Sequence, residues 1–496
     1  MSLLGIDVGT TGCKAAAYSV DGRCLAVSYR EYSPLHIKPE WTELDSKLVA
    51  QRILEVICEI AAKTKKDPIT AICSSSMGEA MTPISGEGKI IGNSIISSVD
   101  TRGGEQLMSI IEKIGKEKFY LINPNVPAPV YSLASILWYK HHKPEIYKET
   151  KKFLLWGDMV AFLLGCELLT SFSLANRTML FDIKEEKWSD IILSFSGVDS
   201  SLLPRPVASG TIAGEIPRKI SSRLGLPARV RLVIGGHDQC CNSLGAGVCS
   251  AGRAVAGLGT FECITPTYNS IPDLKLMLKR GLNVEHHIVK GLYVSFIYNQ
   301  SGSLVRWFRD TFASTEKNEK DIYDKLNNEI PEQPTRIIVL PYFEPTGAPQ
   351  FVTDASGVIA GLKMSTTRGE ILKAIMEGAT FYFVDSMRIL KKMGIDTSAF
   401  IATGGGSKSD KWLQIKADIF GVPFLRPVVT ECGTLGCAIL AGVSTGVFNN
   451  LQEAVSLFVR IERSFEPDMN KHKIYTEQYS RYCTLYKKIY PVISHW

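Results

Sequence analysis

The stretch Leu3-Leu-Gly-Ile-Asp-Val-Gly-Thr-Thr-Gly-Cys-Lys-Ala-Ala-Ala-Tyr-Ser-Val-Asp-Gly22 consists of two short apolar runs joined by a glycine turn. The first run ends at Asp7, and Asp21-Gly22 after the second is typical of a hairpin turn. Two paired strands are therefore predicted. Glycines let backbone N–H groups approach phosphate oxygens, threonine hydroxyls donate hydrogen bonds, and a carboxylate can orient the water shell of Mg²⁺. By itself the stretch fits a polyphosphate site and an ordinary hairpin, in which Asp7 caps a turn, equally well.

Two further glycine-rich turns follow apolar runs, at Gly257-Leu-Gly-Thr260 and Gly404-Gly-Gly-Ser407. The first of them resembles Asp7-Val-Gly-Thr10, which indicates a duplicated domain whose halves each open with a strand, a Gly-Thr turn and a second strand. Three such turns favour a ligand site over plain loops. Their spacing matches neither the Walker A motif, for which Gly9-Thr-Thr-Gly-Cys-Lys14 is too short, nor the dinucleotide-binding fingerprint.

Length and charge restrict the class of protein. A chain of 496 residues is too long for one core and predicts two or three domains. Apolar residues make up 45% and charged residues 21%, as in ordinary globular proteins. The net charge of +6 can attract an anionic ligand, but no window combines clustered Lys and Arg with aromatic residues. A nucleic-acid partner is therefore not expected.

Cysteine spacing and hydropathy indicate in which cellular compartment the protein is expected. The twelve cysteines form no Cys-x-x-Cys pair and the histidines complete no zinc motif, which predicts a reduced, cytoplasmic protein. The N-terminus has no charged leading segment, and Asp7 interrupts its apolar run, so a signal peptide is not expected. No stretch approaches eighteen uninterrupted apolar residues, so we expect no membrane span.

Hydrophobic periodicity predicts alternating strands and helices along the chain. Helices are expected from Asp45 to about Thr64 and from Gly369 to Leu390, and strands over residues 69–74 and 90–99. A further strand over residues 230–234 leads into Gly235-Gly-His-Asp-Gln239. The fold class is therefore α/β in two lobes, with a cleft lined by glycine turns from both.

The whole chain, over residues 1–490, resembles the FGGY family of carbohydrate kinases, a branch of the actin, hexokinase and heat-shock ATPase superfamily. The pattern Gly357-x-Ile-x-Gly-Leu362, seven residues, then Glu370-Ile-x-x-Ala-Ile-Met-Glu377 fits the family's C-terminal signature. The opening turn, Gly236-His-Asp-Gln239, Gly259-Thr260 and the 404–407 turn follow in family order. This resemblance implies two actin/hexokinase-like (ribonuclease H-like) domains with a central cleft. We expect residues 1–247 to bind the sugar and hold the first phosphate loop, and residues 248–496 to bind the nucleotide.

Two positions depart from the family pattern. The family usually has Lys three residues before the position of Trp138, where this chain has Ser135. Its Trp-x-Asp-x-Arg substrate motif reads Ser98-Val-Asp-Thr-Arg102, so the Trp is lost. These departures leave the reaction intact and leave the identity of the sugar open.

The resemblance also implies a role for each site residue. Asp238 would be the catalytic base, and Asp7 would hold Mg²⁺ through water. Lys14 is either a phosphate contact or a solvated lysine at a strand edge, and His237 has no role in the family. The β- and γ-phosphates would contact Gly9, Thr10, Thr11, Lys14, Gly259 and Thr260, and the adenosine would approach Gly404, Gly405, Gly406 and Ser407. The substrate would contact Gly78, Glu79, Asp100, Arg102 and Gln239.

By the same resemblance, the expected activity is phosphorylation of a hydroxyl of a small sugar, ketose or polyol by ATP with Mg²⁺. A pentulose such as xylulose is favoured, although Glu79 lies where xylulokinases carry His. Carboxylates at Glu79 and Asp100 would accept hydrogen bonds from several neighbouring hydroxyls, which suits a ketose or polyol. Glycerol kinases also carry a Glu near position 79, so glycerol or another polyol is one alternative substrate. The chain also resembles autoinducer-2 kinases in its Ser-x-Met-x-Glu79 pattern and in Arg306-Trp-Phe-Arg-Asp310, so an autoinducer-2-type substrate is the other. The non-enzyme alternative is a catalytically silent, sugar-responsive regulator, but no helix-turn-helix or basic segment is found. Homodimers are common in the family, although no interface can be predicted.

Overall fold

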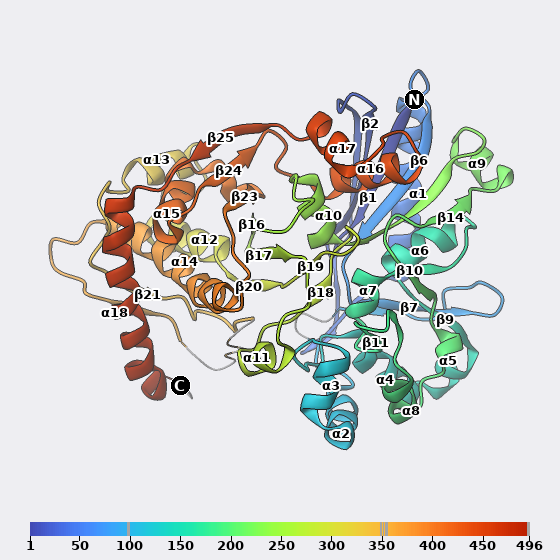
Figure 1. The fold of residues 1–496 in the computed structure, drawn as a ribbon, viewed down its shortest axis with the longest axis horizontal. Coiled ribbons are helices and arrows are strands. Elements are labelled where there is room, and N and C mark those ends of the chain that lie inside the picture. Colours follow the sequence, from blue (N-terminus) through green and yellow to red (C-terminus); the bar gives the residue numbers. More distant parts are fainter. Residues whose placement is uncertain (97–99, 348–349, 351, 353–355, 494–496) are drawn as a thin grey trace.

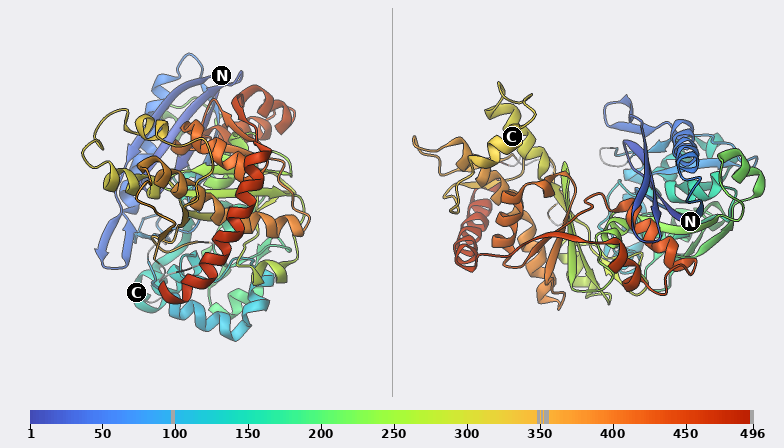
Figure 2. Two further views of the ribbon diagram at one scale, coloured as in Figure 1. Left: turned by 90° about the vertical axis from the view of Figure 1, so that its left-hand side faces the viewer. Right: turned by 90° about the horizontal axis from the view of Figure 1, so that it is seen from above.

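A computed structural model describes residues 1–96, 100–347, 350, 352 and 356–493. The chain forms two lobes, each built around its own β-sheet with helices packed against it (Figures 1 and 2). Among the described residues, no helix combines the length and the apolar character that a bilayer crossing requires.

The first lobe contains a six-stranded sheet that begins with the predicted hairpin. β1 and β2 pair antiparallel, β3 is antiparallel to β2, β6 and β15 are parallel to β1, and β14 closes the other edge antiparallel. In sheet order the strands are β14 (Ile212–Glu215), β15 (Arg231–His237), β6 (Ile69–Ser76), β1 (Ser2–Val8), β2 (Gly12–Ser19) and β3 (Cys24–Glu31).

The second lobe repeats this arrangement. Its strands β16 and β17 form an antiparallel hairpin, β20 is antiparallel to β17, β23 and β24 continue parallel to β16, and β25 is antiparallel to β24. The matching order and directions confirm the predicted duplication. The strands are β16 (Arg253–Leu258), β17 (Phe261–Tyr268), β18 (Glu285–His286), β19 (Tyr293–Val294), β20 (Ile297–Gln300), β23 (Ala399–Thr403), β24 (Phe424–Pro427) and β25 (Ile461–Phe465).

The two longest predicted helices form where expected. The carboxylate of Asp45 accepts hydrogen bonds from the backbone N–H groups of Lys47 and Leu48 and so caps α1 (Ser46–Lys63). A capping box between Thr367 and Glu370 starts α14 (Arg368–Lys392). The capping chemistry therefore fixes where both helices begin.

The junction of the lobes is formed by three short helices, α10 (Asp238–Gly245), α16 (Gly433–Ser444) and α17 (Leu451–Phe458). Although α16 lies late in the chain, it packs against β1 and β6 of the first sheet (Figure 1). A Cβ added at Gly5 would lie 1.9 Å from the carbonyl oxygen of Thr434, so only glycine permits this approach. The division at residues 247 and 248 stays a prediction.

One predicted strand is wrong in extent. Residues 90–99 were expected to form a single strand, but the structure has only β8 (Ser94–Ile95) there, and residues 97–99 lie outside the described residues. A glycine at position 92 packs against Pro83 and Tyr139 and interrupts the run.

The remaining elements surround the two sheets. In the first lobe they are β4 (Leu35–Lys38), β5 (Trp41–Leu44), β7 (Met81–Ser85), α2 (Gly104–Ile114), α3 (Lys116–Ile122), α4 (Ser132–His142), α5 (Pro144–Glu149), β9 (Thr150–Leu155), α6 (Trp156–Leu163), β10 (Leu169–Ser171), α7 (Phe172–Asn176), β11 (Phe181–Asp182), β12 (Lys187–Trp188), α8 (Asp190–Ser196), η1 (Ser200–Leu202), β13 (Arg205–Val207) and α9 (Arg218–Leu224). In the second they are α11 (Leu274–Lys279), α12 (Gly302–Phe312), α13 (Ile322–Asn328), β21 (Ile338–Leu340), β22 (Val358–Ala360), η2 (Gly405–Lys408), α15 (Asp410–Phe420) and α18 (Met469–Ile493).

Candidate active site

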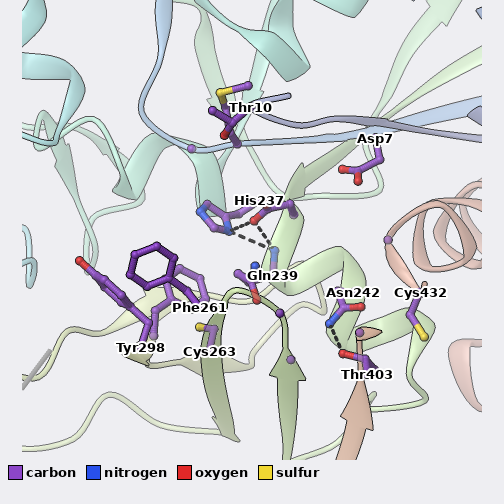
Figure 3. A pocket seen from close by; sticks show the side chains of 18 of the residues that line it. Asp7, Thr10, His237, Gln239, Asn242, Phe261, Cys263, Tyr298, Thr403 and Cys432 are labelled. Atoms are coloured by element: carbon purple, nitrogen blue, oxygen red, sulfur yellow. Dashed lines mark hydrogen bonds and ion pairs between the residues drawn. The ribbon is translucent and has the colours of Figure 1, made fainter. Parts of the chain in front are cut away.

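A cavity of about 640 Å³ lies between the two lobes and is lined by residues from both. In Figure 3, Asp7 and Thr10 lie on one side of it, and Cys263, Tyr298 and Thr403 lie on the other. Of the predicted site residues, nine line it: Asp7, Thr10, Lys14, Gly78, Glu79, Asp238, Gln239, Gly259 and Gly404.

The first edge of the cavity is formed by the turn between β1 and β2. Pairing of the strands places Asp7 opposite Lys14, and the backbone N–H of Gly9 donates to the carbonyl of Gly12 at 2.9 Å. Thr10 lines the cavity, whereas Gly9 and Thr11 do not, and the Thr11 side chain is exposed. The turn therefore brings one of its two threonines to the cavity.

Asp7 lies near the end of β1 and lines the cavity. The hydroxyl of Ser75 on β6 donates to its Oδ1 atom at 2.5 Å. Burial and the nearby carboxylate of Asp238 raise the pKa of Asp7 to about 7. A divalent cation would relieve both effects, and the carboxylate and hydroxyl oxygens that gather here are ligands that suit Mg²⁺. The residues therefore fit the predicted metal, although the described residues contain no cluster of three or more His, Cys, Asp or Glu side chains that could hold an ion directly.

Asp238 lies where β15 ends and α10 begins. Its Oδ1 atom accepts a hydrogen bond from the backbone N–H of Gln239 at 2.6 Å and lies 3.0 Å from Nδ1 of His237. Burial alone would raise the pKa of Asp238, but His237, the Gln239 N–H and Arg177 outweigh it, so the pKa lies below its ordinary value. The carboxylate is therefore ionised at neutral pH.

His237 is a packed imidazole. It is buried, and its ring stacks on that of Phe296 with 4.7 Å between the centroids. Its contact with Asp238 was not anticipated from the sequence, because histidine in this place has no role in the family pattern. The dashed lines around His237 and Gln239 in Figure 3 mark this arrangement.

The second glycine turn lies against the N-terminus of α12. The backbone N–H groups of Gly302 and Ser303 donate to the carbonyls of Gly259 and Thr260 at 3.2 and 3.1 Å. The guanidinium of Arg306 donates to Oγ1 of Thr260 at 3.2 Å. Gly259 lines the cavity and Thr260 does not, so this turn contributes backbone to it.

The third glycine turn reaches the cavity at one residue only. Gly404 lines it with a φ of 80°, a conformation that favours glycine. Gly405 and Gly406 continue into η2 away from the cavity, and the buried Ser407 hydroxyl donates to the Gly404 carbonyl at 2.6 Å. The Ser407 hydroxyl is thus used to close the turn.

The structure does not bring Asp100 and Arg102 to the cavity. Arg102 donates to Asp100 from Nη2 and to Glu43 from Nη1, each at 2.7 Å. The charges of these three residues are therefore paired with one another, and neither Asp100 nor Arg102 lines the cavity. The guanidinium carbon lies 4.4 Å from the centroid of the Trp41 ring and 4.7 Å from that of Trp138. Ser98, which replaces the family's Trp, lies outside the described residues, and the Ser135 hydroxyl donates to the Ser132 carbonyl.

Two charged contacts of the site were missed by sequence reasoning. Arg177, the residue after α7, lines the cavity and pairs with Glu79 and with Glu285 on β18. Glu431 also lines the cavity and forms an ion pair with Lys14. These residues stand alone in the sequence and belong to no glycine turn, so no local pattern could identify them.

Comparison with known proteins identifies the family. Residues 2–245 match the N-terminal domain of the FGGY family of carbohydrate kinases, and residues 285–445 match its C-terminal domain. Xylulose kinase of Bacillus subtilis is 27% identical over 98% of this chain and 96% of its own. Autoinducer-2 kinase of Escherichia coli K12 is 26% identical over 99% of this chain and 95% of its own.

Solved structures share the fold. Xylulose kinase from Lactobacillus acidophilus has a TM-score of 0.90 at 22% identity over 99% of both chains. Plasmodium falciparum glycerol kinase, solved with ADP, has a TM-score of 0.86 at 21% identity over 97% of both chains. The prediction of two actin/hexokinase-like domains is confirmed. With both family domains matched in order across most of the sequence, the chain belongs to the FGGY family of carbohydrate kinases and is a phosphotransferase enzyme.

Proposed function

We propose that the protein transfers the γ-phosphoryl group of ATP to a hydroxyl of a small ketose or polyol, with Asp238 as the general base. The observation that carries this proposal is the position of the Asp238 carboxylate. It lines the cavity together with Glu79 on the predicted sugar side and with Gly259 and Gly404 on the predicted nucleotide side. A base for phosphoryl transfer must stand between acceptor and donor.

The acceptor hydroxyl would be held by Glu79 and the Gln239 amide, next to Asp238. A carboxylate with a pKa below its ordinary value is ionised and can accept the hydroxyl proton as the oxygen attacks phosphorus. The hydrogen bond from the Gln239 N–H to Oδ1 holds the Asp238 carboxylate in one orientation. Closure of the two lobes would exclude water, which otherwise competes as the acceptor.

On the nucleotide side, Asp7 would hold Mg²⁺ through water, while Thr10, Lys14 and the backbone of Gly259 would contact the phosphates. Bound Mg²⁺ neutralises the charge of the phosphates during transfer. Gly404 would let the adenosine approach the backbone. The predicted contacts of Gly9, Thr11, Thr260, Gly405, Gly406 and Ser407 require the nucleotide to extend beyond the cavity.

A pentulose such as xylulose remains the favoured acceptor. Relatives named xylulose kinase support it, and relatives named autoinducer-2 kinase, which are almost as similar, support a dihydroxyketone as the second candidate. We place the enzyme in a reducing compartment such as the cytoplasm, because none of its twelve cysteines is paired in a disulfide.

A panel of pentuloses, dihydroxyketones and polyols, tested for ADP release with Mg²⁺–ATP, tests this function. We expect turnover with at least one ketose or polyol, and none without an acceptor above slow hydrolysis. ADP release that no acceptor stimulates would contradict kinase activity, and glycerol exceeding every ketose would contradict the order of substrates.

A further inference from the structure

Arg177 connects the substrate side of the cavity to the second lobe. It follows α7 in the first lobe and reaches both Glu79, beside the cavity, and Glu285, on β18 of the second lobe. Its Nε donates to Oε1 of Glu79 at 2.7 Å, and its Nη1 donates to Oε1 of Glu285 at 2.9 Å. One guanidinium is therefore shared by two carboxylates from different lobes.

The surroundings leave this guanidinium little further capacity. Nη1 also lies 3.3 Å from the amide oxygen of Asn125, and Nη2 contacts Glu79 again. The rings of Tyr131 and Phe296 cover the guanidinium carbon at 4.8 and 5.5 Å from their centroids. Glu285 is fully buried, and its second oxygen, Oε2, has no hydrogen-bond partner. Burial raises the pKa of Glu285, while the ion pair with Arg177 and the hydrogen bond from the Asn283 amide favour its charged form.

The other basic side chains at the cavity are also matched by acids. Lys14 pairs with Glu431, and His237 lies against Asp238. Every basic side chain that lines the cavity, within the part of the chain that the structure describes, therefore faces a carboxylate. An anionic acceptor would have to enter this site without a free cation to receive it.

We propose that Glu285, as the second carboxylate paired with Arg177, restricts the acceptor site to uncharged polyhydroxy compounds and excludes sugar acids. Glu285 acts through Arg177 and is thus a specificity-determining residue that does not itself line the cavity. This inference rests on the proposed function, since it concerns the acceptor of the same site. It assigns the substrate class by charge: ketoses and polyols are admitted, and aldonates of the same length are rejected.

Xylitol and D-xylonate form a matched pair of probes, because they differ in having a primary alcohol or a carboxylate at one end. Calorimetric titration of the whole protein should show D-xylonate binding at least about tenfold more weakly than xylitol. In Glu285→Gln the dissociation constant for D-xylonate, divided by that for xylitol, should fall by about tenfold or more. The reason is that the cluster of Arg177, Glu79 and Glu285 loses one negative charge, which leaves Arg177 paired with Glu79 alone. Glu186→Gln is the matched control, since Glu186 is a nearby acid that pairs with His286 and not with Arg177, and its ratio should not change.

Three results would overturn the proposal: equal binding of both probes by the unaltered protein, a Glu285→Gln variant that weakens both probes alike, or an equal change in Glu186→Gln. Where Glu285→Gln does not fold, Glu79→Gln frees the same guanidinium from the other side and should change the ratio in the same direction. Failure of the kinase itself is seen separately, as absence of sugar-stimulated ADP release in the unaltered protein.

Discussion

The Nδ1 atom of His237 lies 3.0 Å from Oδ1 of Asp238, while the His237 ring is fixed by stacking on Phe296. The proposed base is therefore oriented by the residue that precedes it in the chain. The contact also lowers the pKa of Asp238 against the effect of burial. A base with a low pKa stays ionised as the solution is acidified.

Replacing His237 tests this orientation. His237→Phe keeps an aromatic ring against Phe296 but removes the nitrogen, so the pKa of Asp238 should rise and the acidic limb of kcat/KM should move toward neutral pH. At pH values below the shifted acidic limb, the turnover of the variant should be lower by about tenfold, because protonated Asp238 cannot accept a proton. A pH-rate profile measures both, with His141→Phe, at an exposed histidine, as the control. An unmoved acidic limb would show that His237 only packs.

The ion pair between Lys14 and Glu431 joins the two lobes beside the predicted phosphate site. If Lys14 contacts phosphate, Lys14→Met should weaken binding of Mg²⁺–ADP by about tenfold, because a charge-assisted contact is lost. Glu431→Gln should leave affinity unchanged or improve it, since Lys14 is released from a competing carboxylate. Calorimetry compares the two variants. Equally weakened Mg²⁺–ADP binding in both variants would mean that nucleotide binding requires the intact ion pair. Unchanged binding in Lys14→Met would mean that Lys14 does not contact phosphate and is a solvated lysine at the strand edge.

A fully buried ion pair supports the second glycine turn. Nζ of Lys416 on α15 donates to the two carboxylate oxygens of Glu262 at 2.7 and 2.8 Å, and the Ser301 hydroxyl donates to Glu262 at 2.8 Å. Lys416→Met should lower the free energy of unfolding by about 3–5 kcal/mol, because it leaves a buried charge unpaired. Adding Glu262→Gln should restore a large part of that loss. Urea unfolding followed by circular dichroism measures both, and additive losses would contradict a paired interaction.

Glu377 gives stability a pH dependence away from the cavity. Burial raises its pKa from 4.5 to about 7, although Thr335 and Tyr475 donate hydrogen bonds to it. Between these two values the folded state binds more protons than the unfolded chain, so the free energy of unfolding should fall as pH rises. From pH 5 to pH 8 the loss should be about 1–3 kcal/mol larger in the unaltered protein than in Glu377→Gln. Parallel urea midpoints for both proteins over this range would contradict the raised pKa.

The sequence identifies what depends on local chemistry. Glycine turns after apolar strands predict a cleft lined from both lobes, and Asp7, Gly259 and Gly404 line the cavity, because a turn's position follows from the strand that precedes it. The caps of α1 and α14 are likewise local hydrogen bonds. The environment of Arg177 was not predictable in this way. Its partners Glu79 and Glu285 are 98 and 108 residues distant in the chain, so only the tertiary fold brings them together.

For Asp100 and Arg102 the sequence motif can be recognised, but the contacts of the two side chains differ from those it predicts. Their spacing is a family motif, yet they lie in an ion-pair network with Glu43, with Arg102 against the rings of Trp41 and Trp138. A motif specifies residue types and spacing, but it does not specify which neighbours will satisfy the charges. Substrate contact by these two residues stays a prediction that this structure does not support.

The most direct test of the account is the turnover of Asp238→Asn with the best acceptor of the panel, measured with its affinity for Mg²⁺–ADP. We expect the turnover number to fall by roughly 10²–10⁴-fold, because the amide cannot accept the hydroxyl proton. Nucleotide affinity should stay close to that of the unaltered protein. Near-full turnover in a correctly folded Asp238→Asn variant would contradict the assignment of Asp238 as the base.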